Sequence, residues 1–262
     1  MFTWNVDPNL ANGPFPVRIY GLFLAVAIVS AFLLFRWQLM REGHPEATAG
    51  WFLAHGLVGV VTGARLVHCF VYDLQRTLAD PWVVIRPWEG GLSSHGALAG
   101  LLLIVVVFGR RHQLRFSDLA DWLSLGAALS VVLVRLGNFF NSEIVGRVTG
   151  GPWGVRFVRW DGPGALPRHP VQLYEATLGA GIFVVLAWID RRQRKTRRPG
   201  LPASLFLASY FGIRLLLEVF KEPEGLPASS LVTLGQILSI APAAVGAMWL
   251  VAVLRRGTQV RE

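Results

Sequence analysis

Charged and amide side chains stand inside or beside the apolar runs of this sequence, where water cannot solvate them. Arg135 ends the apolar run Leu123–Val134, and Asn138, Asn141 and Glu143 follow it closely. An arginine at the centre of a membrane helix is opposed by about 2.5–3.5 kcal/mol, and an unpaired amide also costs free energy. A membrane protein that keeps these groups together is therefore expected to hold them around a polar cavity.

Arginines occur in three different apolar runs, at Arg65, Arg135 and Arg214. A guanidinium keeps its positive charge and presents a planar fork of donors, which suits a phosphate group. Several such groups at one membrane depth favour a phospholipid headgroup as the ligand. Each arginine could instead form a structural pair with a carboxylate. The candidate partners are Glu143, Glu175 and Glu218.

The spacing of Arg214, Glu218 and Lys221 would place all three side chains on one face of a helix. We expect Glu218 to hold Arg214 in place as an outer partner of the ligand-binding group. A lysine at the membrane interface extends its ammonium toward water, so Lys221 needs no functional explanation.

His95 stands among small residues in the stretch GGLSSHGALAG, which are Gly90, Gly91, Ser93, Ser94 and Gly96. Small residues let another helix or a ligand approach closely. A neutral imidazole at this position could take a proton from a nucleophile, and the alternative is a histidine hydrogen-bonded to a neighbouring helix. No ligand-type spacing links the histidines, so we expect neither a metal nor another cofactor.

Two amides and a tyrosine complete the set of candidates. Asn138 and Asn141 lie three residues apart just past Arg135. They could cap the end of the helix, or they could bind the hydroxyls of a glycerol group. On position alone, Tyr20 is a tyrosine of the interfacial aromatic belt.

Composition places these residues in a membrane. The chain has 262 residues, of which 53% are hydrophobic and only 16% charged, whereas soluble domains average about 25% charged residues. Long apolar runs recur from end to end, so we predict one polytopic helical membrane domain over residues 1–262. The net charge of +9 is explained by basic loops rather than by nucleic-acid binding. The single cysteine, Cys69, excludes an internal disulfide.

We predict seven transmembrane helices, each near the ~20 residues needed to cross a bilayer. Arginines and lysines follow every odd-numbered span, which places those loops in the cytoplasm, the N-terminus outside and the C-terminus inside. The longest outer segment, 136–170, is expected to form a small extracytoplasmic arm or cap. The predicted spans are 17–36, 48–71, 91–109, 117–135, 171–190, 202–220 and 230–254.

With this topology, nearly all of the unusual polar groups fall in the outer half of the membrane. A transport path would be expected to carry polar groups in both halves. We therefore expect a pocket that opens to the outer leaflet or to the outer aqueous side. The residues concerned include Tyr20, Arg65, His68, His95, Arg135, Gln172, Tyr174, Glu175, Arg214, Glu218, Gln236 and Ser239.

The same residues carry a family resemblance. The segment RLGNFFNSEIVG, Arg135–Gly146, resembles a signature of the form G-R-x-G-N-F-x-N-x-E-x-x-G, with Val134 in place of the first glycine. The chain resembles bacterial prolipoprotein diacylglyceryl transferases over nearly its whole length. The other matching stretches, in the expected order, are VRIYG at 17–21, SHGALAG at 94–100, HPVQLYEA at 169–176, RLLLEVFKEP at 214–223 and GQILS at 235–239.

The resemblance implies an enzyme of the bacterial inner membrane, acting at its outer face. It would transfer the diacylglyceryl group of phosphatidylglycerol to the thiol of the lipobox cysteine in a prolipoprotein signal peptide, forming a thioether and releasing glycerol phosphate. By position, His95, Arg135 and Arg214 are the candidates for catalysis, with His95 activating the thiol and the arginines holding the phosphate. The candidates for substrate binding are Tyr20, Arg65, Gly96, Asn138, Asn141, Glu143, Gly146, Glu175 and Glu218.

The sequence also departs from the pattern of the family. Ala64–His68 reads ARLVH where a Gly-Arg-x-Gly-Tyr pattern is usual, Lys221 replaces a common arginine, and Ser94 replaces a bulkier residue. Arginine and lysine are not interchangeable in a bidentate site. Two alternatives therefore stay open: a divergent paralogue that transfers a phospholipid-derived group to another acceptor, and a non-catalytic lipid-binding or lipid-transport protein.

Overall fold

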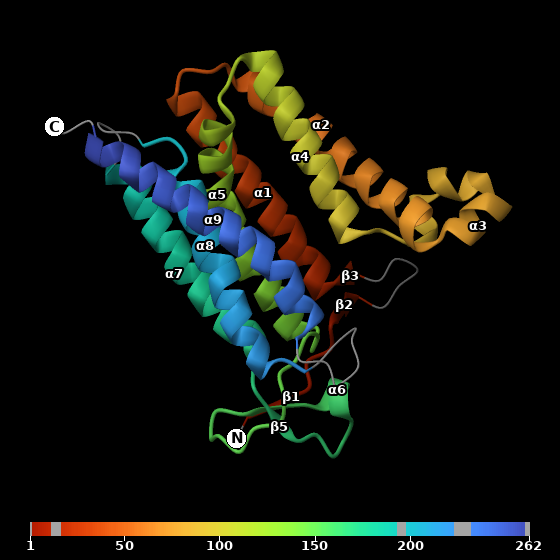
Figure 1. Cartoon of the computed structure of the whole chain (residues 1–262). Coiled ribbons are helices and arrows are strands. Elements are labelled where there is room, and N and C mark those ends of the chain that lie inside the picture. Colours follow the sequence, from red (N-terminus) through yellow and green to blue (C-terminus); the bar gives the residue numbers. More distant parts are fainter. Residues whose placement is uncertain (1, 12–16, 193–197, 223–231, 260–262) are drawn as a thin grey trace. The chain divides into compact units, whose positions relative to one another are not determined.

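The computed structural model describes residues 2–11, 17–192, 198–222 and 232–259. Within these residues, seven helices are long and apolar enough to cross a membrane, which confirms the predicted polytopic helical class (Figure 1). They are α1 (Ile19–Arg41), α2 (Glu46–Val67), α4 (Ser94–His112), α5 (Phe116–Phe140), α7 (Val171–Arg192), α8 (Leu201–Leu217) and α9 (Leu234–Gln259).

Several helices extend past their predicted ends, and α1, α4 and α7 do so at an end that carries basic residues. Helix α1 continues to Arg41, α4 to His112 and α7 to Arg192. Basic side chains in the last turn interact favourably with the partial negative charge at a helix C-terminus. The helices can therefore continue beyond the apolar run from which a span is predicted.

The contacts divide the chain into two compact units, which we name the bundle unit (residues 1–35 and 120–262) and the hairpin unit (residues 36–119). Each is described by itself below, and the single domain inferred from the sequence stays a prediction.

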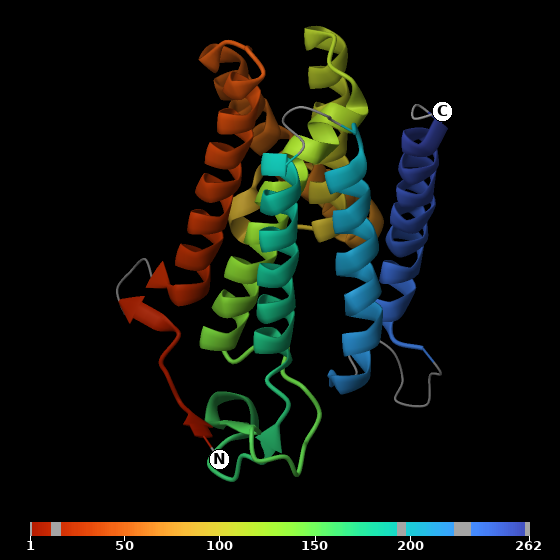
Figure 2. The same cartoon turned by 90° about the vertical axis from the view of Figure 1, so that its left-hand side faces the viewer.

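Helices of the bundle unit pack closely through small residues. Leu125 and Ala128 of α5 form a buried cluster with Ile182 and Leu186 of α7. A Cβ atom added to Gly126 would lie 2.9 Å from the Cα atom of Ala31 in α1, so the glycine allows a close approach of α1 and α5. Figure 2 shows α7, α8 and α9 running alongside one another in this unit.

The segment after α5 begins at residue 141 and folds into short strands and a short helix, which we name the arm. Strand β4 (Val155–Phe157) pairs in parallel with β1 (Phe2–Trp4) and antiparallel with β5 (Pro167–Arg168), and the short helix α6 (Val158–Asp161) follows β4. The N-terminal strand joins this arm, a pairing that the sequence pattern does not predict. A second pair, β2 (Asn9–Ala11) with β3 (Val17–Arg18), precedes α1.

Aromatic and charged contacts anchor the arm. The Trp4 ring lies 4.5 Å from that of Phe139 at the end of α5. Arg168 donates to the Asp161 carboxylate at 2.7 and 2.8 Å and to Glu222 Oε2 at 2.7 Å. Hydrogen bonding to Asp161 is the largest influence that raises the pKa of Arg168. The arm is thus tied both to α5 and to the chain that follows α8.

In the hairpin unit, α2 and α4 cross through two pairs of glycines. A Cβ atom on Gly63 would lie 2.3 Å from the carbonyl oxygen of Gly96, and one on Gly100 would lie 2.0 Å from that of Gly59. The backbones meet so closely that only glycine fits at the crossing. The helices are joined by the π-helical turn η1 (His68–Tyr72), α3 (Leu74–Ala79) and the 3₁₀ turns η2 (Pro81–Ile85) and η3 (Pro87–Glu89).

Candidate active site

Buried charges of the bundle unit form one network across α5, α7 and the chain after α8. Arg135 forms an ion pair with Glu175, and its guanidinium donates to Asn138 Oδ1 at 3.2 Å. Lys221 Nζ lies 2.6 Å from Glu175 Oε1 and 3.3 Å from Glu218 Oε2. Glu175 therefore bridges two cations, and a buried charge is tolerated when it is paired in this way.

Lys221 corrects an expectation from the sequence. Only 6% of this residue is exposed, so its ammonium does not extend to the interface as predicted. Helix α8 ends at Leu217, a 3₁₀ turn (η4, Glu218–Phe220) follows, and Lys221 has an extended backbone. The continuous helical face assumed for Arg214, Glu218 and Lys221 is therefore not formed.

Glu218 contacts Lys221 and Thr233 rather than Arg214. The Thr233 hydroxyl donates to Glu218 Oε1 at 2.9 Å. This contact links the end of α8 to the start of α9. The prediction that Glu218 orients Arg214 directly is not supported by these contacts.

The backbone turns sharply on either side of Glu143. The amide of Ser142 donates to the Phe139 carbonyl at 3.0 Å and that of Glu143 to the Asn138 carbonyl at 2.9 Å, which is the Schellman pattern at a helix C-terminus. Ser142 and Ile144 have φ angles of 54° and 55°, a left-handed conformation that costs roughly 1–2 kcal/mol per non-glycine residue. Strain of this kind gathers at functional sites.

The side chains of Asn138 and Asn141 are hydrogen-bonded to the Glu143 carboxylate. Their amide nitrogens donate to Glu143 Oε2 at 3.4 Å and Glu143 Oε1 at 3.0 Å. Backbone amides satisfy the carbonyls of the last helical turn, so neither side chain acts as the cap that was one of the two alternatives.

Two buried amide oxygens near Glu143 have no hydrogen-bond partner within the part of the chain that the structure describes, namely Asn141 Oδ1 and Gln172 Oε1. Gln172 is held in place because its amide nitrogen donates to the Glu143 carbonyl at 2.6 Å. A buried acceptor without a donor costs free energy. These atoms are therefore suited to accept hydrogen bonds from a polar ligand.

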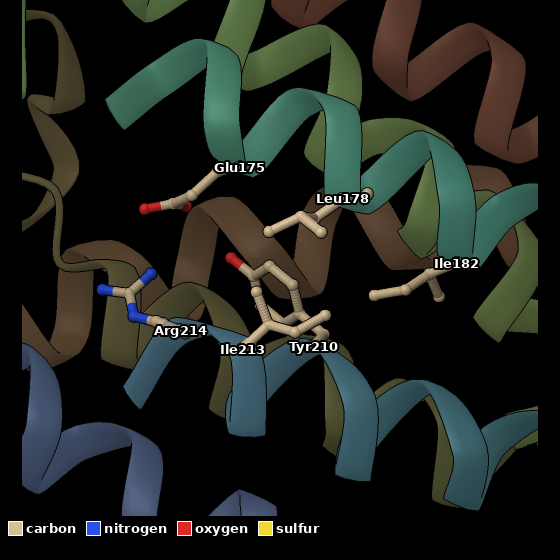
Figure 3. A pocket seen from close by; sticks show the side chains of 7 residues that line it. Glu175, Leu178, Ile182, Tyr210, Ile213 and Arg214 are labelled. Carbon is tan, nitrogen blue, oxygen red and sulfur yellow. The ribbon is translucent and has the colours of Figure 1, made fainter. Parts of the chain in front are cut away.

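A pocket opens between α7 and α8 beside this network. It holds about 200 Å³ of empty space, part of it open to the outside. In Figure 3 the Glu175 carboxylate, the Arg214 guanidinium and the Tyr210 hydroxyl lie toward one end. The apolar part of the lining consists of Leu178, Gly179, Ile182 and Ile213. A pocket with a charged end and apolar walls fits an amphiphilic ligand.

Arg214 differs from Arg135 in its partners. Among the described residues, no hydrogen bond or ion pair engages the Arg214 guanidinium, which acts on Glu175 only through its charge. Arg135, by contrast, is held by Glu175 and Asn138, and it also interacts with the Tyr210 hydroxyl. The donors of Arg214 are therefore available to an anion.

Tyr20 and Gly146 lie at points of close packing in the bundle unit. A Cβ atom on Gly137 would lie 3.1 Å from the Tyr20 ring. The Tyr20 ring of α1 therefore packs against α5 at Gly137, two residues after Arg135. A Cβ atom on Gly146 would lie 2.4 Å from the His169 carbonyl and 2.7 Å from that of Phe220. A glycine is required at 146 because three backbone segments meet there.

His95 is exposed at the start of α4 in the hairpin unit. Its Nδ1 atom lies 3.1 Å from the Tyr72 hydroxyl, which comes from the π-helical turn at the end of α2. The Ser93 side chain caps α4 by accepting from the Gly96 amide at 3.3 Å. Gly96 itself belongs to the crossing of α2 and α4, so packing accounts for this glycine.

Arg65 is surrounded by backbone carbonyls. Its guanidinium donates to the carbonyl oxygens of Arg86 at 2.9 Å and Gly91 at 3.1 Å. It also donates to the carbonyl oxygens of Val83 and Gly90. These bonds fix the loop that leads to α4 and leave little of the fork for a ligand. The arrangement favours a loop-holding role over the predicted contact with a headgroup.

The structure thus brings most of the predicted residues together in the bundle unit, whereas His95, Gly96 and Arg65 belong to the hairpin unit. One member of the cluster, Tyr210, was not among the residues predicted from the sequence. Tyr210 lies four residues before Arg214, so the helical spacing could have indicated a shared face. Gln172 was expected only as a polar residue of the outer half, and Lys221 only as a lysine at the membrane interface.

Comparisons with known proteins identify the family of the chain. A family model described as prolipoprotein diacylglyceryl transferase matches residues 8–252. A phosphatidylglycerol–prolipoprotein diacylglyceryl transferase from Tolumonas auensis is 41% identical and covers 92% of this chain and 93% of its own length. Relatives of the same name from Chromohalobacter salexigens, 38% identical over 92% and 90%, and Vibrio cholerae, 36% identical over 97% and 93%, also match. The chain belongs to the prolipoprotein diacylglyceryl transferase family.

Proposed function

We propose that this chain transfers the diacylglyceryl group of phosphatidylglycerol to the lipobox cysteine of a prolipoprotein. The cysteine thiolate attacks the glyceryl carbon that carries the phosphate ester. A carbon–sulfur bond forms, the carbon–oxygen bond breaks, and glycerol phosphate leaves with the bonding electrons. The thiol proton passes to a base, and the reaction requires no oxidant and no metal.

The Arg214 guanidinium, which has no hydrogen bond or ion pair within the described part of the chain, is the observation that carries this proposal. It lies at the charged end of a pocket whose walls are apolar. A phospholipid has the matching polarity, with an anionic phosphate next to acyl chains. A fixed guanidinium stabilises the charge that develops on the departing phosphate ester.

Arg135 supplies a second cation that is already oriented. Its bonds to Glu175 and Asn138 fix the plane of the guanidinium before substrate binds. A preorganised donor stabilises developing charge without reorganisation during the reaction. Lys221 shares the Glu175 carboxylate, so the cluster keeps positive charge near the pocket.

The glycerol headgroup offers hydroxyl donors to the unpartnered oxygens Asn141 Oδ1 and Gln172 Oε1. A headgroup that lacks these hydroxyls would leave the two acceptors without donors, and such a loss gives strong discrimination. This supports the second of the two alternatives for Asn141. The prediction to test is a preference for phosphatidylglycerol over phosphatidylcholine, whose headgroup has no N–H or O–H donor, and this preference should decrease in Gln172→Leu.

His95 serves as the base in this proposal. A thiol near pKa 8.5 must lose its proton before it attacks carbon. A neutral imidazole is suited to accept that proton. Within the described residues, Tyr72 is its single hydrogen-bond partner, so one ring nitrogen stays available.

We also propose that the arm and the charged cluster face the outer side of a bacterial inner membrane. Basic residues end α1, α4, α7 and α9, and such residues favour the cytoplasmic side. A fluorescent protein fused after α9 should therefore fluoresce, and a periplasmic phosphatase fused there should be inactive. Phosphatase activity of that fusion would contradict the proposed orientation.

The activity is tested with purified full-length protein, phosphatidylglycerol labelled in the headgroup and acyl chains, and a lipobox peptide. We expect thioether-linked peptide and labelled glycerol phosphate in equal amounts, and no product with a serine-substituted peptide. Headgroup release without peptide labelling would assign another acceptor. Lipid binding without turnover would refute the proposed transfer activity.

Variants test the assigned roles. Arg214→Gln should abolish measurable transfer, whereas Arg36→Gln, which removes a half-buried arginine from its pair with Glu46, should not. Near-normal transfer by His95→Gln would refute the role of His95 as the base.

A further inference from the structure

Tyr72 is the partner of His95, and its position depends on an irregular turn. The five residues His68–Tyr72 form a π-helical turn at the end of α2. Turns of this kind are rare and often occur at functional sites, because they re-aim a side chain. Here the turn directs the Tyr72 hydroxyl to 3.1 Å from His95 Nδ1.

The π-helical turn is held in place by a buried hydroxyl. Thr77 Oγ1 contacts the carbonyl oxygens of Cys69 at 2.8 Å and Asp73 at 2.9 Å. Thr77 and Cys69 are almost completely buried. The turn that carries Tyr72 is therefore fixed from its inner side, while the Tyr72 ring is 59% exposed.

We propose that Tyr72 is a positioning residue that holds His95 as the tautomer protonated on Nδ1. In this tautomer Nδ1–H donates to the Tyr72 oxygen, and the lone pair of Nε2 is free to accept a proton. The partner of one ring nitrogen determines the state of the other. A base that is oriented by a third group is the general arrangement for activating a nucleophile.

The contact identifies Tyr72 as the group that orients the His95 ring, and its geometry fits either direction of the hydrogen bond. The assignment of the proton to Nδ1 rests on the proposed function, which needs a lone pair on Nε2. No residue other than Tyr72 in the described part of the chain is bonded to the His95 ring. If Tyr72 instead donated to Nδ1, His95 would present an N–H group at Nε2 and could not take the thiol proton. The two arrangements differ in the position of one hydrogen atom, which can be measured.

The test measures the ring-nitrogen chemical shifts of ¹⁵N-histidine-labelled full-length protein at a pH where His95 is neutral. The chain has six histidines, and His95→Gln assigns the His95 signals. We expect the Nδ1–H tautomer to dominate in the unmodified protein and the populations to shift toward Nε2–H in Tyr72→Phe. Thermal unfolding confirms that the variant is folded.

Tyr174→Phe is a matched control. The Tyr174 hydroxyl lies 3.1 Å from His169 Nδ1, so this variant removes the same kind of contact at another histidine. It should change the His169 signals and leave those of His95 unchanged. Unchanged His95 signals in Tyr72→Phe, or a dominant Nε2–H tautomer in the unmodified protein, would overturn the proposal.

Kinetics separate this inference from the proposed function. We expect Tyr72→Phe to lower kcat about tenfold with little change in KM, which is less than the 10²–10⁴-fold contribution of a full general base. A tautomer shift without any loss of kcat would support the positioning of His95 by Tyr72 and refute the role of His95 as the base.

Discussion

Arg65 and Arg135 are both buried arginines near the ends of apolar helices, yet their partners have different chemistry. Arg65 donates to neutral backbone carbonyls of one loop in the hairpin unit. Arg135 is paired with a carboxylate and an amide side chain in the bundle unit. Carbonyl partners fix a loop, whereas side-chain partners can orient a cation toward a ligand. The residue type alone does not distinguish the two roles.

The largest expected effect separates these roles in catalysis. Arg135→Lys keeps the charge but loses the planar fork, so we expect kcat/KM to fall about 10²–10³-fold, as for the loss of one fixed donor to a developing anion. In Arg65→Lys, kcat/KM should fall less than about tenfold. Initial rates are compared at equal amounts of folded protein. Equal losses in both variants would remove the distinction.

Stability should show the opposite order. In Arg65→Lys, a compact ammonium cannot reach all of the carbonyls that the fork contacts, and each buried acceptor without a donor costs about 1–3 kcal/mol. Thermal unfolding in detergent should therefore begin at a lower temperature for Arg65→Lys than for Arg135→Lys. An unchanged unfolding temperature for Arg65→Lys would contradict the loop-holding role.

Substitutions of glycines in α2 and α4 test whether the stability of the hairpin unit depends on close backbone contact at their crossing. Gly100→Ala places a Cβ atom 2.0 Å from the Gly59 carbonyl, and we expect a loss of about 1–3 kcal/mol in the free energy of unfolding. Gly56→Ala, in the same unit, meets nothing within 4 Å and should be neutral or gain up to about 1 kcal/mol. Similar unfolding curves for both variants would exclude a tight crossing.

The smallest expected effect concerns the turn around Glu143. Ser142 occupies a left-handed position that favours glycine, so Ser142→Gly should raise the free energy of unfolding by roughly 1 kcal/mol. Ser142→Ala keeps the Cβ atom and should give no such gain. A gain in both variants would show that backbone strain is not the cause.

Hydropathy was sufficient to predict the seven spans, because the bilayer imposes a minimum apolar length. The group Arg135, Asn138, Asn141 and Glu143 could also be predicted, since its members are close in sequence. The bridge from Arg135 through Glu175 to Lys221 could not. It depends on how separate helices are rotated and on the end of α8 at Leu217, which hydropathy does not specify.

The partners of Arg65 could not be predicted from the sequence for a related reason. Its partners are main-chain carbonyls of residues 83–91, and no side-chain pattern marks such acceptors. The pairing of Phe2–Trp4 with Val155–Phe157 was equally hidden, because neither segment of three residues carries a distinctive alternation.

That pairing of β1 with β4 limits how the chain can be threaded through a bilayer. Two hydrogen-bonded strands must share an aqueous compartment, so the number of crossings between them has to be even. The four long helices α1, α2, α4 and α5 lie between them, which meets the condition. A variant in which any one of these helices failed to insert would leave the two strands in different compartments, and the arm could not assemble.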